Sequence, residues 1–163
     1  MTRAAEAATA AGVTHTISRI GAVGSAAEAA AARGIALGDL VKTIVVRRAS
    51  DDYVLVLVPA DRTIDWGPLR KALGVNRATL PDAEEAFAAT GYRRGTITPF
   101  GTTGTWPVIA DADLLREREV SIGGGEPGVA LHLSAAELIR GTGATVAAVT
   151  KPVAAEGPGP GGA

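Results

Sequence analysis

The 163-residue chain contains no cysteine, and this excludes several kinds of chemistry at once. Without a thiol there is no disulfide framework, cysteine nucleophile, zinc–thiolate site or iron–sulfur cluster. Aromatic residues are few, at 4% of the chain, and neither sign of charge dominates, because 16 basic residues face 17 acidic ones. Proteins that bind duplex DNA carry a strongly basic surface. Because the charges of this chain are balanced, no DNA partner is expected.

Long apolar segments are also missing. No run approaches the roughly 18 apolar residues that a membrane-spanning helix needs, so no membrane contact is expected. The alanine-rich N-terminus is broken by Glu6 and Thr9, which makes it a poor signal peptide. We therefore expect a cytoplasmic protein, and the length fits one globular domain.

The sequence does contain clear signals for helix ends. Ser25 with Glu28, and Ser134 with Glu137, form capping boxes in which the serine side chain accepts a hydrogen bond from an early backbone N–H. Asp82 begins a variant of the same pattern. These signals and the following glycines predict helices over about 25–33, 82–90 and 134–140, ending at Gly34, Gly91 and Gly141, and a fourth over 65–73 ending at Gly74. A loosely packed helix is expected over 2–11.

Runs of β-branched residues lie between these helices. They predict strands at 41–47, 53–58, 108–110, 120–122, 129–133 and 145–149, with a hairpin turn at residues 49–52. The run 53–58 is apolar without alternation, which indicates a central strand buried on both faces. Because no regular βαβ order is visible, we predict a single compact α+β domain over residues 1–151, with a mixed β-sheet flanked by helices. The glycine- and proline-rich residues 152–163 predict a disordered tail.

Two glycine motifs are similar to nucleotide-binding sequences but lack their context. Residues 123–128 read G-x-G-x-x-G, yet a strand rather than a helix is expected after them. These glycines indicate a turn between strands, or backbone that lets a ligand approach closely. Residues 38–43 end in Lys-Thr like a phosphate-binding loop, but the residue directly before the lysine is Val41 rather than glycine, so no such site is expected.

Lys42 and the loop of residues 95–104 each leave two interpretations open. Lys42 precedes an apolar run, either as a strand-edge cation that reaches water or as a partly buried ammonium that holds an anionic or carbonyl oxygen in a cleft. The loop concentrates glycines and hydroxyls. It is either a connection or a nest of N–H groups for developing negative charge.

Other candidate sites have less support. His15 and His132 lie far apart without acidic residues at metal-binding spacing, so no metal is expected. No G-x-S-x-G motif is present, and Ser134 is explained as a helix cap, which argues against a serine hydrolase. The basic residues are either ordinary solvated charges or a patch for a phosphate backbone. The members of such a patch would be Arg47, Arg48, Arg62, Arg70, Lys71, Arg77, Arg93 and Arg94.

Several segments, taken in order, resemble the YbaK/EbsC family, which is similar to the editing domain inserted in bacterial prolyl-tRNA synthetases. The segments are residues 26–30 with 34–35, 41–46, 90–92 leading into 95–99, 123–125, and 133–134 with 137–138, and they span about residues 13–150. The resemblance implies an α+β domain that hydrolyses the ester between a wrong amino acid and its tRNA, acting in trans. It implies no metal or cofactor. The implied partners are the acceptor end of an aminoacyl-tRNA and a synthetase, with the domain a monomer or a dimer.

The family's essential lysine falls on Lys42, and its G-x-x-x-P loop falls on Gly95 and Pro99. The resemblance implies that the loop N–H groups hold the aminoacyl carbonyl and that Lys42 engages the terminal adenosine or the ester. Water would attack, and no side-chain general base is identified. The catalytic candidates are Lys42, Gly95, Thr96 and Pro99; the substrate-binding candidates are Thr43, Ile97, Thr98, Phe100, Gly101, Gly123, Gly124, Gly125 and His132.

Two positions leave the edited amino acid open. The resemblance places Ala130 at a strand position that is acidic in the cysteine-editing branch of the family. The alanine-editing branch has a histidine-bearing segment, for which only His132 offers a counterpart. The expected substrate is therefore a small noncognate amino acid on tRNA-Pro or a related tRNA. The alternatives are a non-catalytic module that binds a small ligand or an RNA end in the same cleft, and an interaction domain that uses an apolar patch on the first helix.

Overall fold

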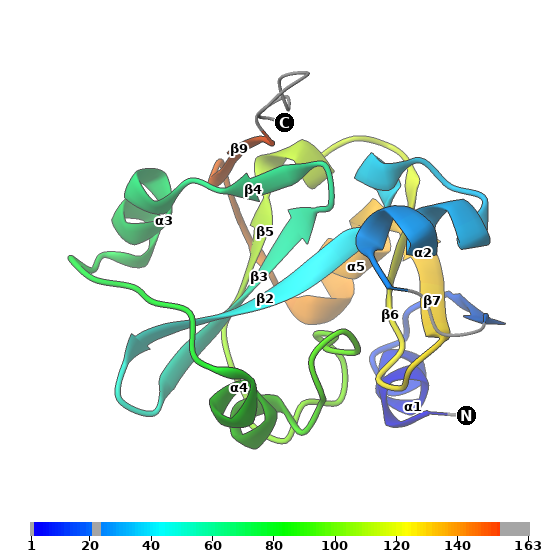
Figure 1. Cartoon of the computed structure of the whole chain (residues 1–163), viewed down its shortest axis with the longest axis horizontal. Helices are drawn as coiled ribbons and strands as arrows, with labels where there is room; N and C mark the ends of the chain where they lie inside the picture. Colours follow the sequence, from blue (N-terminus) through cyan, green and yellow to red (C-terminus); the bar gives the residue numbers. More distant parts are fainter. Residues whose placement is uncertain (1, 21–23, 154–163) are drawn as a thin grey trace.

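The order of helices and strands follows the sequence signals closely. The computed structural model describes residues 2–20 and 24–153 (Figure 1). The helices are α1 (Arg3–Ala10), α2 (Ala26–Arg33), α3 (Trp66–Leu73), α4 (Ala83–Thr90) and α5 (Ala135–Thr142). The strands are β1 (Thr16–Arg19), β2 (Val41–Ala49), β3 (Asp52–Pro59), β4 (Arg62–Ile64), β5 (Val108–Asp111), β6 (Glu119–Gly123), β7 (Val129–Ser134), β8 (Thr145–Ala147) and β9 (Thr150–Pro152). Short 3-10 turns lie at Leu37–Asp39 and Ala112–Leu114.

The strands pair in three sheets, and the α+β class predicted from the sequence is confirmed. The largest sheet has the order β2-β3-β5-β8 and is mixed, because β2 and β3 are antiparallel whereas β3, β5 and β8 run parallel. A second sheet, β1-β7-β6, is antiparallel, and β4 pairs with β9. The predicted tail lies outside the described residues except for Pro152 and Val153, and Pro152 belongs to β9.

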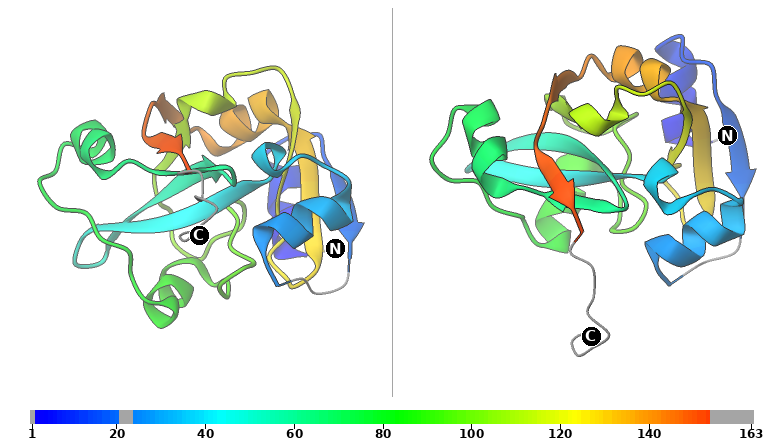
Figure 2. Two further views of the ribbon diagram at one scale, coloured as in Figure 1. Left: turned by 45° about the horizontal axis from the view of Figure 1, so that its top comes forward. Right: turned by 90° about the horizontal axis from the view of Figure 1, so that it is seen from above.

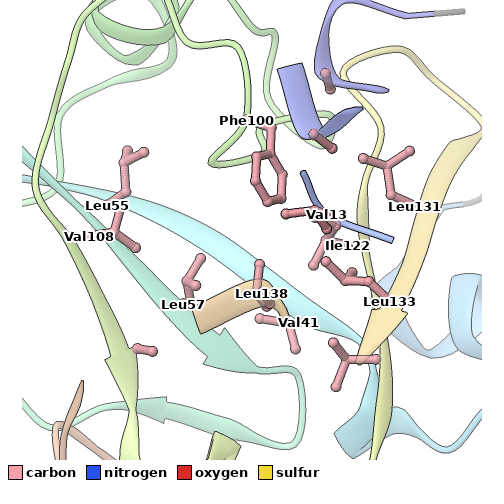
Figure 3. Packing of buried hydrophobic residues seen from close by; sticks show 14 of the residues in the cluster. Val13, Val41, Leu55, Leu57, Phe100, Val108, Ile122, Leu131, Leu133 and Leu138 are labelled. Atoms are coloured by element: carbon pink, nitrogen blue, oxygen red, sulfur yellow. The ribbon is translucent and has the colours of Figure 1, made fainter. Parts of the chain in front are cut away.

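Strand β3 is the central strand that its apolar run predicted. It lies between β2 and β5, and its residues Tyr53 to Val58 are at most 6% exposed. Alternate residues enter two separate clusters, because successive side chains of a strand point to opposite faces. Figure 3 shows the larger cluster, in which Leu55 and Leu57 of β3 pack with residues of the second sheet and with Phe100.

The helix caps also follow the sequence. The side chains of Ser25, Asp82 and Ser134 each accept a hydrogen bond from the backbone N–H three residues later. The predicted end of α5 at Gly141 is wrong, since the helix continues to a cap at Gly143. A β-carbon at position 141 would collide with Val13 and lie 3.4 Å from Phe100, so this glycine allows close packing inside the helix.

Helix α1 is not loosely packed, contrary to expectation. Ala4, Ala5 and Ala8 are fully buried in the larger cluster, because small side chains let the helix backbone approach the core closely. These alanines are therefore not available as an exposed apolar patch. No helix in the described part of the chain is long and apolar enough to cross a membrane.

The two larger sheets meet beside the start of β2. Leu40 forms a parallel bridge to Ser121 of β6, which joins the edge of one sheet to the edge of the other. Figures 1 and 2 show α1 and α2 at the end of the molecule that carries β6 and β7, with α3 at the opposite end. Strand β2 runs from this junction to Ala49, and Arg47 near its end forms an ion pair with Glu85 of α4.

Candidate functional site

A cleft of about 830 Å³ opens along the outer edge of β2. This volume lies within the range of roughly 300–1,000 Å³ that is typical of small-ligand sites. The lining residues come from β2, from α2 and its flanks, from the start of α4, from residues 94–97 and from the turn between β6 and β7. The cleft thus collects segments that are spread over residues 20–129.

The β2 edge offers backbone groups to the cleft. At one end Leu40 bridges Ser121, and at the other Arg47 exchanges two backbone hydrogen bonds with Thr79, at 2.8 and 3.0 Å. The N–H and C=O of one residue point to the same side of an antiparallel ladder, and this side alternates along the strand. The backbone N–H and C=O groups of Thr43 and Val45 therefore point to the same edge of β2 as those of Arg47. In residues 2–20 and 24–153 no other strand pairs there.

Lys42 lies at this edge and lines the cleft. Its side chain is exposed, so the ammonium is accessible to solvent rather than partly buried as one interpretation held. Leu40 packs against Ala29 and Ala30 of α2. The side chain of Lys42 points to the same face of the strand as that of Leu40, because side chains two residues apart in a strand share a face. None of the ion pairs among the described residues involves Lys42.

The loop of residues 91–101 is held in a defined conformation. Gly95 has a φ of 88°, a left-handed conformation that glycine adopts without strain. The N–H and the hydroxyl of Thr96 both donate to the carbonyl of Arg93, at 2.9 and 2.7 Å. The Thr96 N–H is therefore already engaged. Gly95 and Ile97 line the cleft, and the backbone N–H groups of these two residues form no hydrogen bond with the described residues.

The structure brings only part of the expected site residues to the cleft. Lys42, Thr43, Gly95, Thr96, Ile97 and Gly123 line it. The others lie outside the lining: Thr98, Pro99, Phe100, Gly101, Gly124, Gly125 and His132. Thr98 is 0% exposed and Phe100 is 4% exposed, so these two loop residues are buried in the protein rather than open to the cleft.

The glycine turn between β6 and β7 provides room for this loop. A β-carbon at Gly123 would lie 3.0 Å from the carbonyl oxygen of Ile97 and 3.2 Å from that of Thr96. A β-carbon at Gly125 would lie 2.8 Å from the ring of Tyr92. What approaches these two glycines closely is therefore the protein's own loop. Strand β7 follows the turn, so the helix needed by a dinucleotide fingerprint is not there.

Arg33 is a cleft residue that the sequence analysis did not single out. It ends α2, where a cation is ordinary, and nothing in the sequence connects it to β6. Its guanidinium donates a hydrogen bond to the hydroxyl of Ser121 at 2.9 Å. Burial, followed by the positive charge of Arg33, lowers the pKa of His132, whose Nε2 lies 2.8 Å from the Ser18 hydroxyl.

The arginines considered as a phosphate-binding patch are mostly engaged elsewhere. Ion pairs join Arg47 to Glu85, Arg48 to Asp52, Arg62 to Asp111 and Arg93 to Glu84. Arg77 shares a hollow of about 320 Å³ with the first two of these arginines, whereas Arg94 lines the main cleft. The basic residues are thus distributed over separate places. Within the described ranges, no three His, Asp or Glu side chains are grouped to hold a metal ion.

Comparison with known proteins identifies the family. The aminoacyl-tRNA editing domain matches residues 21–140. The chain is 25% identical over 126 residues to "Putative Cys-tRNA(Pro)/Cys-tRNA(Cys) deacylase EbsC" of Enterococcus faecalis, covering 77% of each protein. It is 28% identical over 111 residues to the uncharacterized protein YwhH of Bacillus subtilis, covering 68% of this chain and 70% of YwhH.

Solved structures agree with this assignment. The hypothetical protein APE2540 superimposes with a TM-score of 0.85 at 29% identity, covering 91% of this chain and 99% of that one. A "putative trans-editing enzyme for prolyl tRNA synthetase" gives a TM-score of 0.83 at 29% identity, covering 91% and 95%. With the match over residues 21–140, these similarities show that the chain belongs to the YbaK/EbsC family of aminoacyl-tRNA editing domains.

Proposed function

We propose that this protein is a trans-acting deacylase that hydrolyses the ester of a mischarged tRNA, with a small noncognate amino acid on tRNA-Pro or a related tRNA as its substrate. The observation that carries the proposal is that Lys42, Gly95 and Ile97 line one cleft and that the N–H groups of Gly95 and Ile97 are unengaged. The names of EbsC and of the trans-editing neighbour support the substrate class and a prolyl-tRNA synthetase as partner.

The loop N–H groups match the charge that develops during ester hydrolysis. A water molecule attacks the carbonyl carbon, and the carbonyl oxygen becomes an oxyanion. Preorganised donors at that oxygen are worth about 3 kcal/mol each in a site that excludes water. Collapse of the intermediate breaks the bond to the ribose oxygen, which takes up a proton, and releases a free amino acid and an uncharged tRNA end. Gly95 and Ile97 are the donors that we assign to the oxyanion.

Lys42 is suited to hold the tRNA end rather than to act as a base. Its ammonium is exposed at the cleft and is a flexible donor for phosphate or ribose oxygens. The carboxylate of Asp82 also lines the cleft, but it caps α4 by accepting the N–H of Glu85 at 2.8 Å. We therefore assign orientation of the water to a ribose hydroxyl of the substrate and assign no side chain as general base.

The test measures ester hydrolysis on tRNAs charged with alanine, cysteine, serine, threonine and proline. Wild type is compared with Lys42→Ala and with the matched control Lys151→Ala, which changes an exposed lysine of β9 outside the cleft. We expect rapid release from one noncognate charge, at least a hundred-fold slower release with Lys42→Ala, and no change with Lys151→Ala. Circular dichroism checks that each variant is folded. Release at the spontaneous rate across the whole panel would overturn the proposal in favour of a non-catalytic binding module.

A further inference from the structure

Arg33 is anchored at the junction of the two larger sheets. Its guanidinium donates to the hydroxyl of Ser121, a residue that is 0% exposed. Ser121 also forms the bridge to Leu40 that joins the sheets. A guanidinium has five N–H donors in a planar arrangement, and this bond uses one of them. The remaining donors belong to a half-buried side chain that lines the cleft.

The charge of Arg33 is not balanced by a carboxylate in the described ranges 2–20 and 24–153. Ion pairs there are formed by seven other arginines, namely Arg47, Arg48, Arg62, Arg93, Arg116, Arg118 and Arg140. Burial lowers the pKa of Arg33. A partly desolvated cation is unfavourable unless an anion accompanies it. The cleft beside Arg33 is where such an anion would lie.

The chemistry of the substrate supplies that anion. In an aminoacyl-tRNA, the negative charge nearest to the ester is the phosphodiester on the 5′ side of the terminal ribose. If Gly95 and Ile97 hold the carbonyl, this phosphodiester falls in the same cleft, because the two groups are separated by a single ribose. A guanidinium binds phosphate oxygens through two parallel N–H donors.

We propose that Arg33 is a substrate-binding residue that holds the terminal phosphodiester of the tRNA, positioned by Ser121; this inference rests on the deacylase function proposed above. Lys42 leaves β2 on the side covered by α2, so the arginine and the lysine approach the RNA end from neighbouring elements. Arg33 thereby recognises the tRNA end whatever amino acid it carries.

The first test measures binding of the trinucleotide CCA, which cannot be hydrolysed at an ester. Wild type is compared with Arg33→Ala, Arg33→Lys and Ser121→Ala, with Arg116→Ala as the control because Arg116 is an exposed arginine outside the cleft. We expect about ten-fold weaker binding with Arg33→Ala, a smaller loss with Arg33→Lys, about three-fold weaker binding with Ser121→Ala, and no change in the control. Binding of adenosine, which has no phosphate, should be the same in all five proteins.

Kinetics and competition separate this inference from the proposed function. With aminoacyl-tRNA, Arg33→Ala should raise KM about ten-fold at nearly constant kcat, and with an aminoacyl ester of adenosine it should change neither. The inference would be overturned if the Arg33→Ala and Arg33→Lys proteins fold and bind CCA as tightly as wild type does. It would also be overturned if inorganic phosphate displaced CCA equally well from wild type and from Arg33→Ala. If CCA binding depends on Arg33 but no ester is hydrolysed, the deacylase proposal fails and the phosphate subsite stands.

Discussion

Arg3 donates a hydrogen bond from Nε to the carbonyl oxygen of Gly101 at 2.8 Å, which ties the first turn of α1 to the end of the cleft loop. The same guanidinium lies 4.6 Å from the ring centre of Tyr92. The Tyr92 hydroxyl in turn donates to the carbonyl of Phe100 at 2.5 Å. Helix α1, which does not line the cleft, therefore holds both ends of the loop that does.

This relationship predicts that Arg3→Ala slows ester hydrolysis about ten-fold while the protein stays folded. The change removes a charge-assisted hydrogen bond and a cation–π contact, each worth about 1 kcal/mol at an exposed site. The melting temperature should fall by roughly 2–8 °C. Single-turnover hydrolysis and thermal unfolding measure the two effects. A lower melting temperature with an unchanged rate would mean that α1 stabilises the domain without positioning the loop.

Gly123→Ala is predicted to damage activity more than stability. The added β-carbon would lie 3.0 and 3.2 Å from two carbonyl oxygens of the loop, so the loop must shift by a few tenths of an ångström. Shifts of about 1 Å in a catalytic group can cost about a hundred-fold in rate. We expect a ten- to hundred-fold slower hydrolysis and a loss of about 1–2 kcal/mol in the free energy of unfolding.

Gly67→Ala is the matched control for this prediction. Gly67 lies in α3, and a β-carbon there meets no atom within 4 Å. Because Gly67 lies outside the cleft, Gly67→Ala should leave the rate unchanged. The gain of alanine over glycine in a helix and the restriction that Pro68 places on the residue before it oppose each other, so the free energy of unfolding should change by less than about 1 kcal/mol. An unchanged rate in Gly123→Ala as well would show that hydrolysis tolerates movement of the loop.

Much of the fold could be predicted from local signals. The caps at Ser25, Asp82 and Ser134 and the apolar run of β3 each depend on neighbouring residues alone, and all are present in the structure. The strands β1, β4 and β9 were not predicted. They have only three or four residues and depend on partners distant in the sequence, as in the pairing of β4 with β9. Gly141 was misread as a helix end because its packing partner Val13 is distant in the sequence.

The site was predicted less completely, for the same physical reason. Lys42 and the loop that begins at Gly95 were singled out from the residues, with two interpretations each, and the family resemblance gave them roles. Lys42 and residues 95–97 line the cleft. The Thr96 N–H donates to the carbonyl of Arg93, and this bond depends on the conformation of the loop, which the sequence does not show. The contact between Arg33 and Ser121 spans 88 residues, and no local pattern encodes such a pairing.

The two tyrosines are predicted to ionise only in strong alkali while the protein is folded. The hydrogen bond from Tyr53 to Glu85 raises the pKa of Tyr53 to about 12, and burial raises the pKa of Tyr92. The protonated form is thus favoured in the folded state. Their contribution to stability is complete below about pH 10, the ordinary pKa of tyrosine, and is lost as the pH rises through the folded values.

Tyrosinate absorbance near 295 nm, recorded while raising the pH, measures this effect. The variant Tyr92→Phe isolates Tyr53, since the chain has only two tyrosines. We expect a midpoint of about 12 in the folded variant and about 10 in denaturant. A folded midpoint near 10 would mean that the bond between Tyr53 and Glu85 does not persist in solution.

His132 is predicted to remain neutral at pH values where an ordinary histidine is already partly charged. Burial is the larger cause of its lowered pKa, and the positive charge of Arg33 is the second. Because the unfolded chain takes up this proton first, stability should begin to fall as the pH drops below about 6.5. NMR titration can follow His132 directly, since His15 is the only other histidine. Arg33→Ala should raise the pKa of His132, whereas Arg33→Lys, which keeps the charge, should raise it less. Equal values in wild type and Arg33→Ala would place the guanidinium away from Ser121 in solution and would remove the anchor on which the phosphate subsite depends.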